Sequence, residues 1–236
     1  MARRWQQALK SNSNMTQEFQ DKVRIEVNRY IFNKGFAPTT LELSKAFRTS
    51  EDTVKVGLRK LADNHAIVLH PNSFDIWAAQ PFALFPTLFW VESGEKKWWG
   101  NCTWCSLGIA SLTKQSTTIF TKVSGEEEPI RIDIIDNKVI QKDLLVHLPI
   151  PAKRFWDNVI YTCANMLTFK NEEQINQWCK RHNVIKGQVL TMDKVWELAK
   201  SWYGNYLDDT WTRKTPEYAE SLFEKVGLTG DFWKMR

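Results

Sequence analysis

The sequence predicts an α+β protein, in which an N-terminal helical module precedes an antiparallel or mixed sheet core flanked by helices. Apolar residues at helical spacing dominate the first part of the chain. Strand-like runs separated by turn residues follow, and capped helical segments return towards the C-terminus. Because 43% of the 236 residues are hydrophobic, the chain can bury an ordinary core, and its length favours two unequal domains.

We expect three regions along the chain. Residues 1–15 are expected to be a flexible tail, residues 16–80 a winged-helix-like module, and residues 81–236 the domain that carries the chemistry. The boundary is placed where Ala, Pro and Phe become frequent, around residues 78–86. The formal charge of +5, from 32 basic and 27 acidic side chains, is too mild to require a nucleic-acid partner.

The first module is predicted from helix caps and apolar spacing. Residues 17–33 have the helical pattern, and Gly35 follows as a stop signal. Thr40 and Ser50 are then expected to cap two further helices, which together form a helix-turn-helix. Two short strands around a turn at residues 71–73 complete a winged-helix outline.

A winged-helix outline raises the question of DNA binding. The helix after Ser50 carries Lys55, Arg59 and Lys60, which can contact phosphates. Acidic residues interrupt the same helix, and winged helices also serve as scaffolds. DNA is therefore not the expected partner, and a metal-responsive regulator is kept only as an alternative.

The second domain is expected to begin with an antiparallel meander that contains one helix and to end in helices. Strands are predicted over residues 88–91, 117–123, 130–135 and 138–148, and helices over residues 104–112, 172–182, 193–203 and 215–226. Gly227 is the expected stop of the last helix. Residues 155–169 follow the meander, with Cys163 near their middle.

The cysteines are the most informative side chains. Four cysteines, with no apolar segment long enough for a signal peptide or a membrane span, favour a reducing, cytoplasmic location. Cys102 and Cys105 form a CxxC pair in a Trp-rich segment, and Cys163 follows about sixty residues later. Thiolates are the softest ligands that a protein offers, so these three residues indicate soft-metal chemistry.

A CxxC pair is also typical of redox pairs and of zinc sites. A thioredoxin-like motif begins a helix within a βαβ unit, which the predicted meander does not offer. A zinc site built on Cys102, Cys105 and Cys163 needs a fourth ligand, for which Cys179 and His182 are candidates.

Several motifs resemble the alkylmercury (organomercurial) lyase family. They are WGNCTWCSLGI at residues 99–109, FWDNVIYTC at 155–163, WC at 178–179, WYG at 202–204, TPE at 215–217 and GLTGDFW at 227–233. The resemblance extends over residues 41–233 through the order and spacing of these motifs. It implies protonolysis of carbon–mercury bonds in small organomercurials without a cofactor, with mercury as substrate and product and a mercuric reductase as a recipient of the ion.

The resemblance also implies roles for the three cysteines. By position, Cys102 and Cys163 are the mercury-binding thiolates, and Cys105 stands where the family has its proton-shuttling aspartate. Two sulfur donors push electron density onto the mercury-bound carbon, which then takes a proton from a positioned acid. Cys105 can be that acid, or a third ligand that holds mercury, copper, zinc or a trivalent arsenical for storage. Asp157 is another candidate acid.

The large side chains near the cysteines are candidate walls of an apolar pocket. Trp98, Trp99, Trp104 and Trp156 flank the motifs and can exclude water from an organic group. We therefore favour a lyase, with a sequestration protein for a soft metal or metalloid as the alternative.

Overall fold

The computed structural model describes residues 16–126 and 128–236, so the tail predicted for residues 1–15 lies outside the described residues. The described chain forms eight α-helices together with antiparallel strands, which confirms the α+β class. It divides into two compact units. The first runs to Gln80 and includes Tyr206–Arg213, and the second comprises Pro81–Asn205 and Lys214–Arg236.

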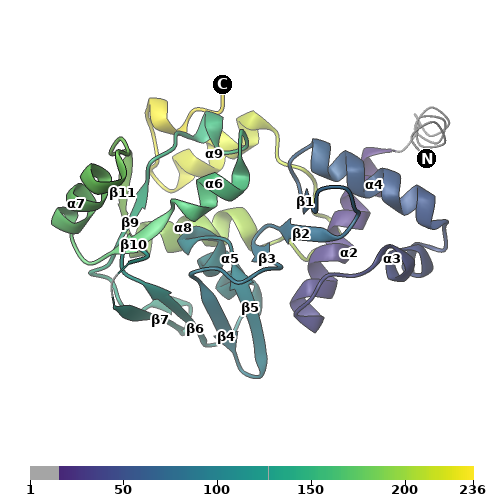
Figure 1. Cartoon of the computed structure of the whole chain (residues 1–236), viewed down its shortest axis with the longest axis horizontal. Helices are drawn as coiled ribbons and strands as arrows, with labels where there is room; N and C mark the ends of the chain where they lie inside the picture. The colour runs from purple at the N-terminus through teal and green to yellow at the C-terminus, as the bar shows by residue number, and fades with distance from the viewer. Residues whose placement is uncertain (1–15, 127) are drawn as a thin grey trace. The chain divides into compact units, whose positions relative to one another are not determined.

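The first unit contains three helices and a short hairpin. These elements are α2 (Gln17–Lys34), α3 (Thr40–Phe47), α4 (Glu51–Asp63), β1 (Val68–Leu69) and β2 (Ile76–Ala79) (Figure 1). Ser50 caps α4 as expected, but the cap of α3 is Thr39 and not Thr40. Thr39 and Glu42 form a capping box, in which each side chain accepts a hydrogen bond from the backbone N–H of the other. The winged-helix description of this unit stays a prediction.

A segment from far along the chain completes the first unit. The guanidinium of Arg24 on α2 lies 4.1 Å from the ring centroid of Tyr206 and 3.7 Å from that of Trp211. Arg29 donates from Nε to the carbonyl of Leu207 at 2.7 Å. Cation–π contacts of a buried guanidinium are worth about 2 kcal/mol each. They hold residues 206–213 against α2.

The larger sheet of the second unit has the strand order β3-β5-β4-β6-β7-β8, and its pairs are antiparallel. Its strands are β3 (Phe82–Ala83), β4 (Trp90–Ser93), β5 (Lys96–Gly100), β6 (Thr117–Lys122), β7 (Pro129–Ile135) and β8 (Lys138–Val139). Trp98, Val91, Ile119 and Ile132 are cross-strand neighbours, and all are buried. This apolar row forms one face of the core.

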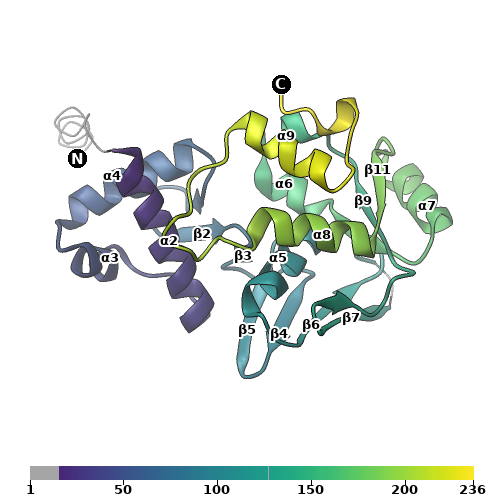
Figure 2. The ribbon, with the colours of Figure 1, turned by 180° about the vertical axis from the view of Figure 1, so that it is seen from behind.

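Two helices cover that face. Helix α5 (Thr103–Thr113) packs on β4, β5 and β6, and α8 (Met192–Tyr203) packs against α5 (Figure 2). The helices meet closely at Gly108, where a Cβ atom would lie 2.3 Å from Cδ2 of Tyr203. Because only glycine leaves this space, Gly108 determines how near the Tyr203 ring comes to the first turns of α5.

A smaller antiparallel sheet has the order β10-β9-β11, from β9 (Leu145–Leu148), β10 (Leu167–Phe169) and β11 (Gln188–Thr191). Helix α7 (Glu172–His182) packs beside β10 (Figure 1). The single strand predicted over residues 138–148 is wrong, because β8 and β9 belong to different sheets. At the break, the side chain of Gln141 accepts the hydrogen bond of the Asp133 backbone N–H at 2.7 Å.

Residues 155–169 form a short helix followed by a strand. Helix α6 (Val159–Ala164) begins at Asn158, whose side chain caps the N–H of Tyr161, and β10 follows after one turn. Helix α9 (Pro216–Lys225) is capped by Thr215, and Gly227 follows in a left-handed conformation, as the sequence predicts. No helix within the described residues has the length and apolar character needed to cross a membrane.

His147 in β9 is a buried histidine of the smaller sheet. Its side chain has no exposed surface, and burial, with the nearby Lys186 cation, lowers its pKa to about 4. Its Nε2 accepts a hydrogen bond from the N–H of Gly187 at 3.4 Å. The imidazole is therefore neutral in the folded protein at pH 7.

This histidine makes the stability of the protein depend on pH. The unfolded state takes up a proton on His147 near pH 6.5, but the folded state does so only near pH 4. The contribution of the neutral imidazole to the free energy of unfolding is therefore complete above pH 6.5 and is lost as the pH falls from 6.5 to 4. We expect the unfolding free energy to fall by about 2 kcal/mol between pH 7 and pH 5 because of this group. Urea titrations should show a flatter dependence of the unfolding free energy on pH for His147→Gln than for the parent. An unchanged slope in His147→Gln would contradict the assignment.

Candidate functional site

The CxxC pair lies at the start of α5, directly after the turn that leaves β5. Cys102 is the N-cap residue, and its sulfur accepts the backbone N–H of Cys105 at 3.3 Å. Ser106 donates its N–H and its hydroxyl to the carbonyl of Cys102 at 2.9 and 2.8 Å. These contacts hold both cysteines in the first helical turn, although a thiol is a weak capping group.

Cys163 reaches the same place from α6. Thr103, which stands between the two cysteines of the motif, donates its N–H and its hydroxyl to the carbonyl of Met166 at 3.3 and 3.1 Å. Its hydroxyl also lies 2.9 Å from the hydroxyl of Thr168. The turn after α6 is thereby attached to the start of α5, and Cys163 lies one turn before it.

The sulfur atoms of Cys102, Cys105 and Cys163 all lie within 4.8 Å of one another. The three side chains are almost completely buried, with exposed fractions of 0%, 1% and 7%. All are free thiols. Three sulfur atoms bound to one metal at about 2.3 Å lie about 4 Å from one another, so the three sulfurs can share one ion after shifts of less than about 1 Å.

Two further residues contact these sulfurs. The hydroxyl of Tyr203 on α8 lies 3.3 Å from the sulfur of Cys105, and the thioether of Met166 lies 3.9 Å from that of Cys102. Tyr203 is itself 3% exposed, and its ring packs edge-on against Trp104 at 5.7 Å. These partners of the cluster carry no charge.

The cluster favours one thiolate, at Cys105. Burial opposes the ionisation of Cys105, but hydrogen bonds from Cys102, Cys163 and Tyr203 outweigh it and hold the pKa of Cys105 well below its ordinary value. Burial raises the pKa of Cys102 far above its usual range, and the neighbouring Cys105 adds to this effect. The pKa of Cys163 is raised by its contacts with Cys102 and Cys105 and by burial. Once one thiolate has formed, its charge disfavours a second.

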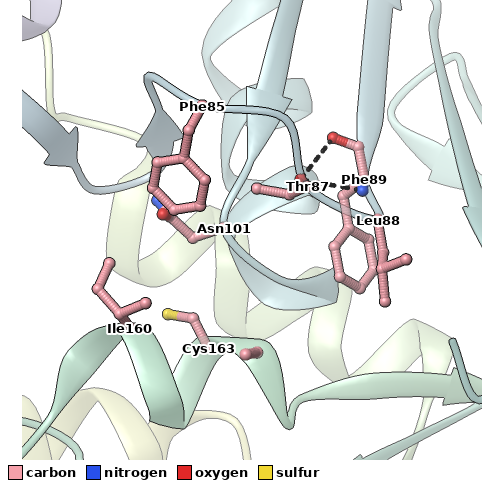
Figure 3. Close-up of a pocket in the computed structure, with 8 residues that line it drawn as sticks. Phe85, Thr87, Leu88, Phe89, Asn101, Ile160 and Cys163 are labelled. Carbon is pink, nitrogen blue, oxygen red and sulfur yellow. Dashed lines mark hydrogen bonds between the residues drawn. The ribbon is translucent and has the colours of Figure 1, made fainter.

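A cavity of about 170 Å³ opens beside Cys163. Figure 3 shows the sulfur of Cys163 directed towards the space between Ile160, Asn101 and Phe85. The lining residues, all uncharged, are Phe85, Thr87, Leu88, Phe89, Asn101, Ile160, Cys163 and Ala164. Tryptophans were predicted to line such a pocket, but its apolar wall is formed by phenylalanines and aliphatic residues. Trp99 packs instead on Trp90, with ring centroids 4.5 Å apart.

The other candidate residues lie away from the cluster. Asp157 is exposed and pairs with Arg154 at 3.0 Å. The sulfur of Cys179 lies 3.8 Å from Nε2 of His147, and His182 contacts Glu126 at 2.5 Å. Among the described residues, no fourth His, Cys, Asp or Glu joins the three sulfurs. The four-ligand zinc site is therefore not formed.

Three residues of the site were not singled out from the sequence. Thr103 and Met166 act through contacts between distant segments, for which no local pattern exists. Tyr203 belongs to the WYG motif at residues 202–204, which resembled the family but gave no indication of a contact with Cys105.

Fold and site together define an α+β protein with a buried three-thiol centre suited to a thiophilic metal. Residues 82–204 match the family described as MerB, alkylmercury lyase. Because this match spans more than half of the chain, the protein belongs to the alkylmercury lyase family.

Known structures agree with this fold. The chain is similar to the crystal structure of the mercury-bound form of MerB2, with a TM-score of 0.61 and 18% sequence identity. The similarity covers 81% of this chain and 96% of the other. A comparison with curated proteins finds no match.

The hydrogen bond between the Tyr203 hydroxyl and Cys105 can be tested through the pKa of Cys105. A hydrogen bond to a charged group is worth about 1.5–3 kcal/mol, so loss of the Tyr203 hydroxyl in Tyr203→Phe should raise the pKa of Cys105. Thiolate absorbance followed across pH measures this, with the Cys105 signal assigned by its loss in Cys105→Ser. Tyr161→Phe is the control, because Tyr161 is 55% exposed. Identical titrations of Tyr203→Phe and the parent would refute the contact.

Proposed function

We propose that the protein is an organomercurial lyase that cleaves carbon–mercury bonds by protonolysis. The observation that carries this proposal is the convergence of Cys102, Cys105 and Cys163 within 4.8 Å in a buried, uncharged setting. Mercury in an alkylmercury cation is a soft centre, for which thiolates are the preferred ligands. Membership of the alkylmercury lyase family supports the same chemistry.

Cys102 and Cys163 are the proposed mercury ligands. The first of these thiols binds the alkylmercury cation as a thiolate and gives a neutral alkylmercury thiolate, while its proton leaves with the ligand that the substrate releases. When the second thiol binds, its proton leaves and its sulfur donates an electron pair to the metal. This increases the electron density on the carbon, and the electron pair of the carbon–mercury bond becomes basic enough to accept a proton. The products are a hydrocarbon and mercuric ion held by two thiolates.

Cys105 is the proposed proton carrier. In the resting site it is the thiol with the lowered pKa, as expected of a group that stands in the place of a carboxylate. It accepts the proton of the second thiol that binds mercury and then delivers it to the departing carbon. Tyr203 holds Cys105 by its hydrogen bond and does not itself contact the reacting carbon in this scheme.

The cavity beside Cys163 is the proposed position of the organic group. A dry cavity of about 150 Å³ lined by Leu, Ile and Phe binds benzene, so the cavity of about 170 Å³ is large enough for a phenyl substituent. An organic group that fills this cavity would displace water from the side of Cys163, which limits proton exchange with solvent during the transfer. A phenylmercury compound is therefore a suitable test substrate.

Sequestration of a soft metal without turnover is the second candidate, because a third sulfur can hold the ion too tightly for release. DNA-dependent regulation receives less support. In the described residues of the first unit, 16–80 and 206–213, ten basic and ten acidic side chains balance, so this unit lacks the basic excess of a DNA-binding module.

The decisive assay follows benzene release from phenylmercury in the presence of excess small thiol. The reduced protein should release benzene over repeated turnovers, and Cys102→Ser and Cys163→Ser should each abolish release. Cys179→Ser is the matched control, since this buried cysteine lies beside His147 and outside the cluster. Stoichiometric mercury binding without benzene would contradict the lyase proposal and support sequestration.

The proton carrier is tested separately at position 105. Because general acid–base catalysis contributes about 10²–10⁴-fold, Cys105→Ser should slow benzene release by at least about a hundredfold. Cys105→Asp restores a carboxylate and should retain turnover. Mercury binding, followed by displacement of a chromogenic thiol reagent, should persist in both variants. Full activity in Cys105→Ser would remove Cys105 from the mechanism.

A further inference from the structure

The site has one more thiol than a divalent mercury ion needs for charge balance. Two thiolates neutralise mercuric ion, and a third leaves the complex with a charge of −1. Zinc with three thiolates has the same excess, and copper(I) with three thiolates carries −2. Three thiolates are matched in charge only by a trivalent centre.

Charge balance matters here because the site is buried. Cys102 and Cys105 are at most 1% exposed, and the polar neighbours of their sulfurs include the Tyr203 phenol, the Met166 thioether and the backbone N–H groups of Asn101 and Cys105. The wall of the adjoining cavity consists of uncharged residues. Burial of an uncompensated charge in such surroundings is strongly unfavourable.

We propose that the three thiols also form a binding site for trivalent arsenic, taken up as neutral arsenous acid. Three arsenic–sulfur bonds form and three arsenic–oxygen bonds break. The hydroxyl groups leave as three water molecules, with the protons of the cysteine thiols and, where Cys105 is already a thiolate, one proton from solvent. Arsenic stays trivalent, so the reaction needs no oxidant or reductant. Arsenous acid and the three-thiolate arsenic product are both neutral, so the bound site carries no net charge. This activity is independent of carbon–mercury bond cleavage.

The geometry of the cluster suits a three-coordinate centre. Trivalent arsenic forms three bonds on one side and keeps a lone pair on the other. Cys102 and Cys105 approach from the start of α5, Cys163 approaches from α6, and all sulfur atoms lie within 4.8 Å of one another. The cavity beside Cys163 gives a small neutral molecule access to the sulfur of Cys163, the first that it would meet. Zinc prefers four ligands in closed sites, and the described residues offer no fourth His, Cys, Asp or Glu.

The test is arsenite binding by the reduced full-length chain, measured as arsenic retained after equilibrium dialysis and as near-ultraviolet arsenic–thiolate absorbance. We expect one arsenic per chain and, at the arsenic X-ray absorption edge, three sulfur neighbours. The third bond is intramolecular, so Cys105→Ser and Cys105→Asp should weaken arsenite binding by about a hundredfold or more. Cys179→Ser should bind like the parent.

Mercury binding by the same variants shows whether weaker arsenite binding reflects the loss of one ligand or the misfolding of the variant. Both position-105 variants should still bind mercuric ion through the other two thiols, which shows that the site has folded. Absence of stoichiometric arsenite binding in the parent, or equal binding in Cys105→Ser, would overturn the proposal. Fewer than three sulfur neighbours at bound arsenic would also overturn it. Benzene release is measured independently, so either function can fail without the other.

Discussion

The hydrogen bonds of Thr103 to Met166 and Thr168 are the contact on which the site depends. They attach the start of α5 to the turn after α6, although these segments lie more than sixty residues apart in the sequence. The N-cap geometry of Cys102 places the first two sulfurs in one helical turn. The Thr103 contacts then bring the third sulfur to them from a different element.

The packing around α5 protects this arrangement from water. One side of the helix rests on the larger sheet and another on α8, so its first turns are almost wholly buried. The close approach at Gly108 lets Tyr203 reach Cys105. In the buried cluster, hydrogen bonds offset the cost of a single thiolate, and further thiolates form only when a bound metal compensates their charge. The other thiols of the cluster therefore lose their protons when a metal binds and not in the free protein.

The sequence predicted the elements whose signals are local. Helix α7 and the cap of α4 at Ser50 are found as expected, because capping residues and apolar spacing lie within a few positions of each other. The strand over residues 138–148 was wrong, since the polar residues 141–143 interrupt its apolar pattern and the side chain of Gln141 replaces a ladder partner at the break. Strand β11 was missed because it is short and its pairing with β9 is long-range.

The site was predictable only in part. The CxxC spacing indicated a thiol centre, and the family resemblance linked it to Cys163. The proximity of the three sulfurs, the contact of Tyr203 and the phenylalanine wall of the cavity all arise from tertiary packing, which leaves no periodic signal in the sequence. The resemblance predicted that Cys105 stands in the place of a carboxylate, but what a thiol does at this position depends on burial and on neighbours that only the structure supplies.

The most direct test of the account is a crystal structure of the reduced protein after reaction with phenylmercury. We predict one mercury atom bonded to the sulfurs of Cys102 and Cys163, no phenyl group on the metal, and Cys105 unbound but still in contact with Tyr203. Mercury bonded to Cys105 in place of either proposed ligand, or a phenyl group still attached to mercury held by both ligands, would contradict the proposed division of roles.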